Sequence, residues 1–322
     1  MNTVLHVLPW LATGGVEQLR LLIAKHLTSY HHIVVCSRAS DPMRSAFRDA
    51  GAQVVELGGS WGLRDITGHF RLRNEWKARK PDIVHAGVYE AVIHVAFCSV
   101  MRPTHARVIL EEHDFPLQRS RANQVAMGLA TRWADAFIAV SPQVEIYLRS
   151  LPLSNASKIH MIPNGVQVRS CNPTAGARVR SELSIPVNSI VVGTAARLND
   201  DHKRISDLIR ATNIVNQRGQ SVHLLVVGEG PDETVLKRLA IELQVDDKVH
   251  FAGVTSRMED YYSAMNIFAL VSSREAFGMS LAEAMLVGLP TIATGIGGIA
   301  YVAGGKTTSY GVAVAAPDEV AD

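Results

Sequence analysis

Short apolar runs rich in β-branched residues alternate with helical patterns along the chain, and this alternation restricts the possible folds most strongly. Such runs are typical of parallel strands buried on both faces, which need a helix as the crossover between them. The pattern therefore predicts an α/β protein with doubly wound parallel sheets. Because 322 residues exceed what one hydrophobic core usually supports, we expect two such domains.

The candidate strands fall into two series, one for each predicted domain. In the first half, Val16, Leu19, Ile23 and Leu27 repeat at helical spacing and predict a helix over 16–27 after the first strand. The candidate strands are 4–8, 32–36, 53–56, 82–85, 107–110 and 136–140 in the first series, and 190–195, 222–227, 249–251, 267–270, 291–293 and 312–314 in the second.

The segment between the two series has the composition of a hinge. Pro163-Asn164-Gly165 is followed by a stretch, 171–186, that is rich in Pro, Gly, Ser and Asn. We place the boundary near residue 168, which gives domains 1–168 and 169–322. Ligands of open α/β sheets bind outside the carboxyl ends of the strands, so two such sheets facing each other would enclose a central cleft.

Bulk properties exclude several classes of protein. A formal charge of +2 provides no field that would favour nucleic acid as a partner. The three cysteines are far apart and form no CxxC pair, which argues against disulfides and structural zinc and fits a cytoplasmic protein. Residues 1–11 resemble a buried strand more than a signal peptide, and the apolar stretch 88–101 is too short to span a membrane.

The segment 273–290, SREAFGMSLAEAMLVGLP, carries the most chemical information. It predicts a strand, an acidic loop and a helix that begins near Gly278 or Met279, whose free first-turn amides suit phosphate oxygens. Glu275 lies in the loop and Glu283 about one turn inside the helix, so one carboxylate can face a sugar while the other accepts bonds from ribose hydroxyls. The alternative is that both are solvated charges at a helix end.

Glu275 and Glu283, with Phe277 and Gly278 between them, resemble the E-x7-E signature of the retaining glycosyltransferases of family 4, also called group 1. The resemblance extends along the chain to a glycine loop at 14–17, a strand end at 112–114 and a hinge at 162–166. It implies the GT-B fold, in which two Rossmann-like domains face a central cleft. The family also has terminal helices that cross back onto the first domain, and we expect these to be missing because the chain stops at Asp322.

Arg197 and Lys203 follow an apolar strand in the arginine-then-lysine spacing of the family. The resemblance implies that they bind the diphosphate, where preorganised cations stabilise a developing negative charge. We therefore expect no metal, and the sequence contains no Asp-x-Asp element. The alternative is a solvated loop beside Asp200 and Asp201.

The resemblance assigns roles in both domains. It places His113 near the reacting anomeric carbon, and it implies that Glu275 positions the sugar hydroxyls first and is catalytic second. Without the resemblance, His113 would be interpreted as a structural hydrogen-bonding partner. The predicted catalytic residues are His113 and Glu275, the predicted donor-binding residues are Gly14, Gly15, Arg197, Lys203, Phe277, Gly278, Met279, Ser280 and Glu283, and Glu17 is expected on the acceptor side of the cleft.

Three further features of the sequence bear on its function. Residues 295–300 satisfy the G-x-G-x-x-A form of the dinucleotide fingerprint, which makes an oxidoreductase the rival, although glycines interrupt the expected crossover helix. The basic helix expected over 64–80 is either a solvated helix with a packed inner face or a contact with an anionic membrane surface. Tyr301 stands where the family usually has a glutamate, which is a departure in the donor site.

Together, these observations predict a hexosyltransferase-type enzyme that transfers a sugar, with retention, from a nucleotide-diphosphate sugar. A uridine donor is favoured, and the acceptor is a glycan or a lipid-linked glycan in polysaccharide or lipopolysaccharide assembly. No cofactor, metal or nucleic acid is expected, and the protein would be cytoplasmic, at most peripheral to the membrane. Two alternatives stay open: a sugar-nucleotide epimerase of the same fold and a non-catalytic nucleotide-sugar-binding protein.

Overall fold

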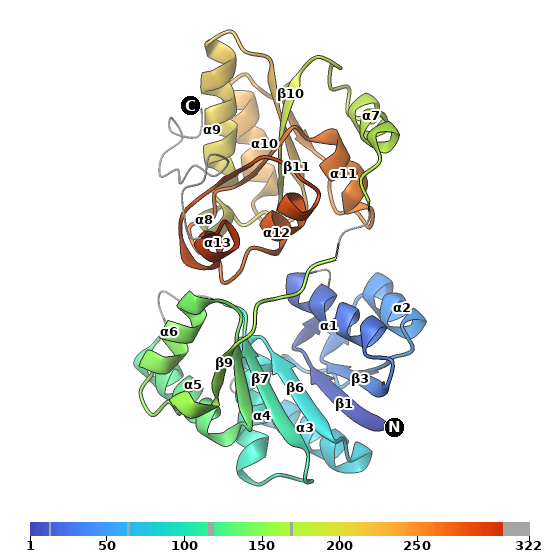
Figure 1. Ribbon diagram of the computed structural model, residues 1–322, viewed down its shortest axis with the longest axis vertical. Helices are drawn as coiled ribbons and strands as arrows, with labels where there is room; N and C mark the ends of the chain where they lie inside the picture. Colours follow the sequence, from blue (N-terminus) through green and yellow to red (C-terminus); the bar gives the residue numbers. More distant parts are fainter. Residues whose placement is uncertain (13, 63–64, 115–118, 168–169, 305–322) are drawn as a thin grey trace. The chain divides into compact units, whose positions relative to one another are not determined.

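The computed structural model of the protein describes residues 1–12, 14–62, 65–114, 119–167 and 170–304. The chain divides into two compact units, Met1–Gly165 and Val166–Asp322. Each unit contains a parallel sheet with helices packed against it, as Figure 1 shows, so the prediction of two doubly wound α/β domains is confirmed. The predicted boundary at residue 168 lies outside the described residues.

The amino-terminal unit is built on a seven-stranded parallel sheet with the order β5-β3-β1-β6-β7-β8-β9. Strand order reverses between β1 and β6, which makes their carboxyl ends the switch point where ligands of such sheets bind. Six strands coincide with predicted runs, and the seventh, β9, was not predicted. The strands are β1 (Asn2–Val7), β3 (Tyr30–Cys36), β5 (Gln53–Glu56), β6 (Ile83–Gly87), β7 (Arg107–Glu112), β8 (Ala136–Ala139) and β9 (Ile159–Met161), and β2 (Trp10–Leu11) pairs separately with β4 (Arg38–Ala39).

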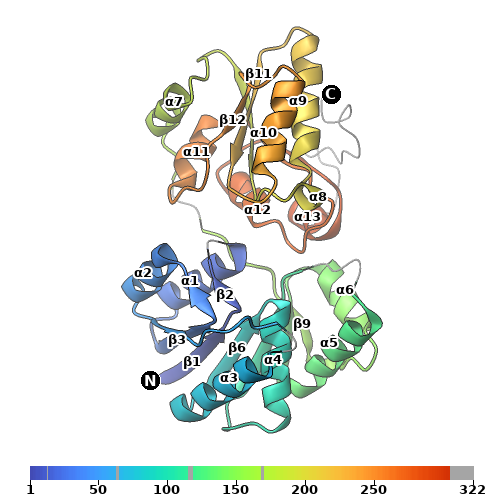
Figure 2. The same cartoon turned by 180° about the vertical axis from the view of Figure 1, so that it is seen from behind.

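Three α-helices of this unit begin at side chains that accept a hydrogen bond from a free amide. Ser120 and Ser141 accept the capping bonds of two of them, and Asp65 caps a third through the amide of Gly68. Figure 2 shows two helices of the unit, α3 and α4, side by side. The helices are α1 (Gly15–His26), α2 (Asp41–Asp49), α3 (Ile66–Arg79), α4 (Tyr89–Val100), α5 (Arg121–Trp133), α6 (Pro142–Ser150) and the 3-10 helix η1 (Ala156–Lys158).

The apolar face predicted for 16–27 is only partly correct. Leu19 is buried, but Leu27 is the C-cap residue and is 47% exposed. Arg20 lies on the buried face instead and is fully buried. Arg20 follows Val16 by four residues and so lies on the apolar stripe, but a pattern of apolar residues alone does not mark an arginine as buried.

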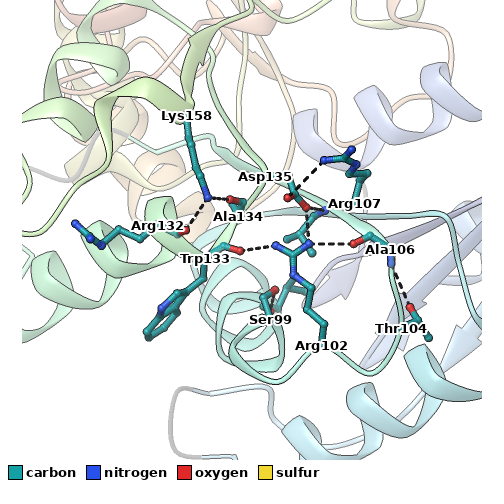
Figure 3. A network of polar contacts seen from close by, with 12 residues as sticks. Ser99, Arg102, Thr104, Ala106, Arg107, Arg132, Trp133, Ala134, Asp135 and Lys158 are labelled. Atoms are coloured by element: carbon teal, nitrogen blue, oxygen red, sulfur yellow. Dashed lines mark hydrogen bonds and ion pairs between the residues drawn. The ribbon is translucent and has the colours of Figure 1, made fainter.

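A network of polar contacts joins the segments that precede β7 and β8, at the amino ends of these strands (Figure 3). Arg102 donates to Asp135 Oδ2 at 2.7 Å and to the Trp133 carbonyl at 2.9 Å. Asp135 also accepts from the Val108 amide at 2.8 Å, and Lys158 donates to the Ala134 carbonyl at 2.5 Å. These contacts lie at the edge of the sheet opposite to the switch point.

The carboxy-terminal unit has a five-stranded parallel sheet with the order β12-β11-β10-β13-β14. All five strands have the predicted bounds, and the sixth predicted run, 312–314, lies outside the described residues. Strand order reverses between β10 and β13, which is the switch point of this sheet. The strands are β10 (Ile190–Ala195), β11 (Val222–Val227), β12 (Val249–Phe251), β13 (Ile267–Leu270) and β14 (Thr291–Ala293).

Apolar side chains from both faces of this sheet form two clusters, one centred on Phe268 and Tyr262 and the other on Leu224 and Val226. No described helix of either unit is long and apolar enough to cross a membrane. The helices of the carboxy-terminal unit are α7 (Pro173–Glu182), α8 (Asp200–Lys203), α9 (Ile205–Gln217), α10 (Glu233–Glu242), α11 (Met258–Ala264), α12 (Met279–Leu286) and α13 (Gly297–Val302).

Gly176 provides a test of this packing. A Cβ atom at Gly176 in α7 would lie 2.3 Å from the Ser263 carbonyl oxygen in α11, so the two helices can only meet across a glycine. We expect Gly176→Ala to lower the free energy of unfolding by about 1–3 kcal/mol in urea denaturation. The control is Gly165→Ala, because a Cβ there meets nothing within 4 Å. Equal stability of the two variants would contradict this packing.

Candidate functional site

The switch point of the carboxy-terminal sheet brings a lysine and a glutamate into contact. Lys203 ends α8, which follows β10, and Glu275 lies in the loop that follows β13. Lys203 Nζ donates to Glu275 Oε2 at 2.5 Å, and the two side chains are only 16% and 19% exposed. Two predicted site residues that are 72 positions apart therefore form one half-buried ion pair.

Hydrogen bonds fix the acidic loop against α8. His202 Nε2 donates to the Arg274 carbonyl at 2.7 Å, and the Ser273 amide donates to the His202 carbonyl at 2.9 Å. Burial and the neighbouring Lys203 lower the pKa of His202, which keeps its ring neutral. The Lys203–Glu275 pair is thus held by the backbone on both sides.

The helix that carries the second glutamate begins as predicted, at Met279. Gly278 is its N-cap residue and has φ +94°, a left-handed conformation that glycine adopts without strain. Among the described residues, the amides of Met279 and Ser280 donate no hydrogen bond, so they are available to an anion. The side chain of Phe277 is buried, which leaves its backbone as the part that a ligand could contact.

Gly297 and Gly298, two of the three glycines of the dinucleotide-like segment 295–300, allow α13 to pack on the acidic loop. The Gly298 amide donates to the Glu275 carbonyl at 2.8 Å. A Cβ at Gly297 would lie 2.3 Å from that oxygen, and one at Gly298 would lie 2.0 Å from the Ala276 carbonyl oxygen. These two glycines therefore shape the loop around Glu275, and this packing role explains them without a dinucleotide.

A second pair of glycines shapes the loop of Arg197. A Cβ at Gly228 would lie 2.0 Å from the Ala196 carbonyl oxygen, and one at Gly230 would lie 2.3 Å from that of Leu198. The backbone on each side of Arg197 is therefore packed against a glycine turn, while the Arg197 side chain is exposed. Within the described part of the chain, this guanidinium forms no ion pair.

Glu283 is held by a tyrosine that sequence reasoning missed. Tyr262, which is 1% exposed, donates through its hydroxyl to Glu283 Oε2 at 2.8 Å. Burial raises the pKa of Glu283, and the bond from Tyr262 opposes this rise only in part. Since Tyr262 lies on an apolar helix face, its sequence pattern indicates a core residue and gives no sign of this contact.

The other predicted residues belong to the amino-terminal unit. Gly14 is the N-cap residue of α1, Gly15 begins that helix, and Glu17 lies in its first turn. His113 follows β7 and has a side chain that is 6% exposed, with Nε2 2.6 Å from Glu111 Oε2. The site residues thus form two groups, one at the switch point of each sheet.

The chain matches two known families along most of its length. Residues 13–170 match Glycosyltransferase Family 4, and residues 177–322 match Glycosyl transferases group 1. It is 23% identical over 224 residues to the O-antigen biosynthesis glycosyltransferase WclY of Escherichia coli, which covers 67% of this chain and 61% of that protein. It is 27% identical over 233 residues to the lipopolysaccharide core biosynthesis glycosyltransferase LpsD of Rhizobium meliloti, which covers 72% of this chain and 61% of that protein. The chain therefore matches about 61% of the length of these relatives.

Solved structures show the same fold. The crystal structure of HepE from Anabaena, in complex with UDP and glucose, is similar with a TM-score of 0.85 at 22% identity, over 99% of this chain and 87% of that one. WaaG, a glycosyltransferase involved in lipopolysaccharide biosynthesis, is similar with a TM-score of 0.68 at 17% identity, over 93% and 83%. Two doubly wound domains of this kind define the GT-B class. Within it, the chain belongs to glycosyltransferase family 4, also called group 1.

The raised pKa of Glu283 predicts a pH-dependent stability. The folded protein binds the Glu283 proton more tightly than the unfolded chain does. Above the raised pKa of the folded state, the buried carboxylate therefore lowers the free energy of unfolding. This loss disappears as the pH falls from the folded-state pKa to the lower pKa of the unfolded chain. Glu283→Gln keeps an acceptor for Tyr262 without the charge. We expect its Tm to exceed that of the wild type by a few degrees at pH 8 and to match it near pH 4.

The matched control is Glu242→Gln, which removes a glutamate whose side chain is 62% exposed from the same unit. Its Tm should follow the wild type at every pH, because an exposed carboxylate has little desolvation to lose. A Glu283→Gln variant that is less stable than the wild type at pH 8 would show that the buried charge stabilises the fold.

Proposed function

We propose that the protein transfers a sugar from a nucleoside-diphosphate sugar, with a uridine donor, to a glycan or lipid-linked acceptor with retention of configuration. The observation that carries this proposal is the Lys203–Glu275 pair. Glu275 lies four residues before a helix whose first amides donate no hydrogen bond to any described residue. Family membership, the UDP complex of HepE and the lipopolysaccharide roles of the relatives support it.

The chemistry of the two cations suits a diphosphate. The ammonium of Lys203 has three donors, and one of them is used by Glu275, so two remain for phosphate oxygens. Arg197 is exposed beside the same strand ends and offers a planar guanidinium. These two cations would stabilise the negative charge that develops on a leaving nucleoside diphosphate. In this proposal, a metal ion is not needed for that stabilisation.

Retention follows from attack on the face that the leaving group vacates. The acceptor oxygen bonds to the anomeric carbon as the bond to the diphosphate breaks, and the departing phosphate oxygen takes the proton of the acceptor hydroxyl. Glu275 shares its Oε2 with Lys203, so it is suited to accepting bonds from sugar hydroxyls more than to nucleophilic attack. His113 contacts the reacting sugar in this proposal, and Glu283 contacts the ribose.

A donor panel tests the site. We expect UDP-sugars to raise the Tm of the protein more than GDP- or ADP-sugars do. Lys203→Ala and Glu275→Ala should each weaken donor binding by roughly tenfold or more, since charge-assisted hydrogen bonds contribute about 1.5–3 kcal/mol. The control is Lys237→Ala, which breaks an exposed lysine–glutamate pair of the same unit. Unchanged binding in both site variants would exclude this site.

The same donor separates the alternatives. A transferase consumes it only when an acceptor is present. Consumption without an acceptor would indicate an epimerase or a hydrolase, and tight binding without turnover would indicate a binding protein.

We also propose that helices α3 and α4 contact an anionic membrane. Their exposed apolar side chains include Phe70 and Phe97, and the His69 ring lies between the two helices with its centroid 4.7 Å from that of Phe97. Arg73 and Lys77 follow Phe70 at helical spacing, which places cations beside the apolar surface. This surface, the α3–α4 apolar face, comprises Ile66 (69% exposed), Phe70 (58%), Phe97 (61%), Val100 (54%) and Met101 (73%).

Vesicle flotation tests this contact. We expect the protein to bind vesicles that contain phosphatidylserine, with affinity falling as salt rises, and to bind neutral vesicles less. Phe70→Ser with Phe97→Ser should weaken binding roughly tenfold or more, because a buried phenylalanine contributes about 1.5–3 kcal/mol. Ile146→Ser, at a 68% exposed position on α6, is the control. Equal binding by the two variants would refute the contact.

A further inference from the structure

A buried ion pair joins α1 to β7 at the switch point of the amino-terminal sheet. Arg20 Nη2 donates to Glu111 Oε2 at 2.5 Å, and the two side chains are 0% and 7% exposed. Nε and Nη1 of Arg20 donate no hydrogen bond within the described residues. Such a pair is costly to desolvate, and an apolar pair of similar volume is often at least as stabilising. Stability alone therefore does not explain its presence.

The carboxylate of Glu111 also sets the state of His113. Burial alone would raise the pKa of Glu111, but Arg20, His85 and His113 together hold it well below its usual range. An ionised carboxylate only accepts hydrogen bonds, so the 2.6 Å contact requires a proton on His113 Nε2. In the neutral ring, Nδ1 is then the nitrogen with a free lone pair.

The end of β6 is shaped to admit both side chains. A Cβ at Gly87 would lie 2.6 Å from Arg20 Nη2 and 3.1 Å from His113 Cδ2, so any larger residue there would displace them. The next residue, Val88, has φ +74°, a left-handed conformation that is strained for a β-branched side chain. Such strain costs about 1–3 kcal/mol and is concentrated at functional sites.

A row of buried histidines, His85, His6 and His32, lies on the other side of Glu111. His85 Nε2 lies 3.0 Å from Glu111 Oε1, and the His85 ring is next to that of His6. His32 Nε2 must donate to the Leu27 carbonyl, so its Nδ1 accepts from His6 Nε2 at 3.0 Å. Burial, before any other cause, lowers the pKa of His6 and of His85.

We infer that Arg20 and Glu111 are positioning residues for His113: their ion pair fixes the ring with Nε2 protonated and leaves Nδ1 to accept a hydrogen bond from a substrate hydroxyl. The inference deepens the proposed function, because it assumes that His113 contacts the sugar. A new role for α1, the helix that begins at the glycine loop, follows from this inference. Its buried Arg20 orients His113 by way of Glu111.

The test replaces the whole pair at once, with Arg20→Met and Glu111→Val in one protein. Because no charge is left unpaired, we expect this double variant to fold with a Tm close to that of the wild type. In the free protein, 15N NMR of the His113 ring should show the Nε2–H tautomer in the wild type and a mixture of tautomers in the double variant. The kcat for transfer should fall roughly tenfold to hundredfold, as when the outer partner of a functional histidine is removed, with the KM for donor unchanged.

The control is Arg102→Met, which breaks the ion pair with Asp135 at the opposite end of β7. It should lower stability without changing the His113 tautomer or kcat. If the double variant does not fold, Gly87→Ala displaces the same side chains without removing a charge. An Nδ1–H tautomer in the wild type, or an unchanged tautomer and kcat in the variant that folds, would overturn the inference. NMR needs no substrate, so a wild type with the expected tautomer but no transfer activity would count against the proposed function alone.

Discussion

The reversal of strand order within each parallel sheet is the constraint on which the rest of the structure depends. The chain that follows β10 and the chain that follows β13 run to opposite sides of the sheet. The loops after these two strands therefore lie side by side at the carboxyl ends of the strands. One loop brings Lys203 and the other Glu275, and their contact at 2.5 Å is a consequence of this topology. The same reversal between β1 and β6 brings Gly87 beside Arg20 and His113 in the amino-terminal unit.

Glycines allow neighbouring loops to approach each other closely at the carboxyl ends of the strands, and this packing determines the shape of the site. Gly298 lets α13 donate to the Glu275 carbonyl, and Gly228 admits the loop that carries Arg197. Both are packing roles, yet Gly298 belongs to the segment 295–300, which satisfies a dinucleotide fingerprint in the sequence. A glycine pattern therefore indicates that something approaches the backbone closely, and only the fold shows whether it is a ligand or another loop.

The sequence predicted the parts of this structure that depend on local pattern. All five described strands of the second sheet have their predicted bounds, because buried parallel strands are continuous apolar runs, and α12 begins where Gly278 and the acidic loop indicated. Contacts between distant residues could not be predicted. Tyr262 and Glu283 are 21 positions apart, and Arg20 and Glu111 are 91 apart. One local signal was present for Arg20, which follows Val16 by four residues and so falls on the apolar stripe.

The two ion pairs differ in a way that matches the work proposed for each. Lys203 and Glu275 are 16% and 19% exposed, so water and ligands can reach them and each has bonding capacity left for a substrate. Arg20 and Glu111 are sealed at 0% and 7%, so a ligand cannot exchange for either partner. A solvent-accessible ion pair is suited to binding a charged substrate and releasing a charged product. A fully buried ion pair keeps one geometry throughout a catalytic cycle. In the roles proposed here, one ion pair binds a ligand and the other orients a side chain, and the difference in burial accounts for the difference in role.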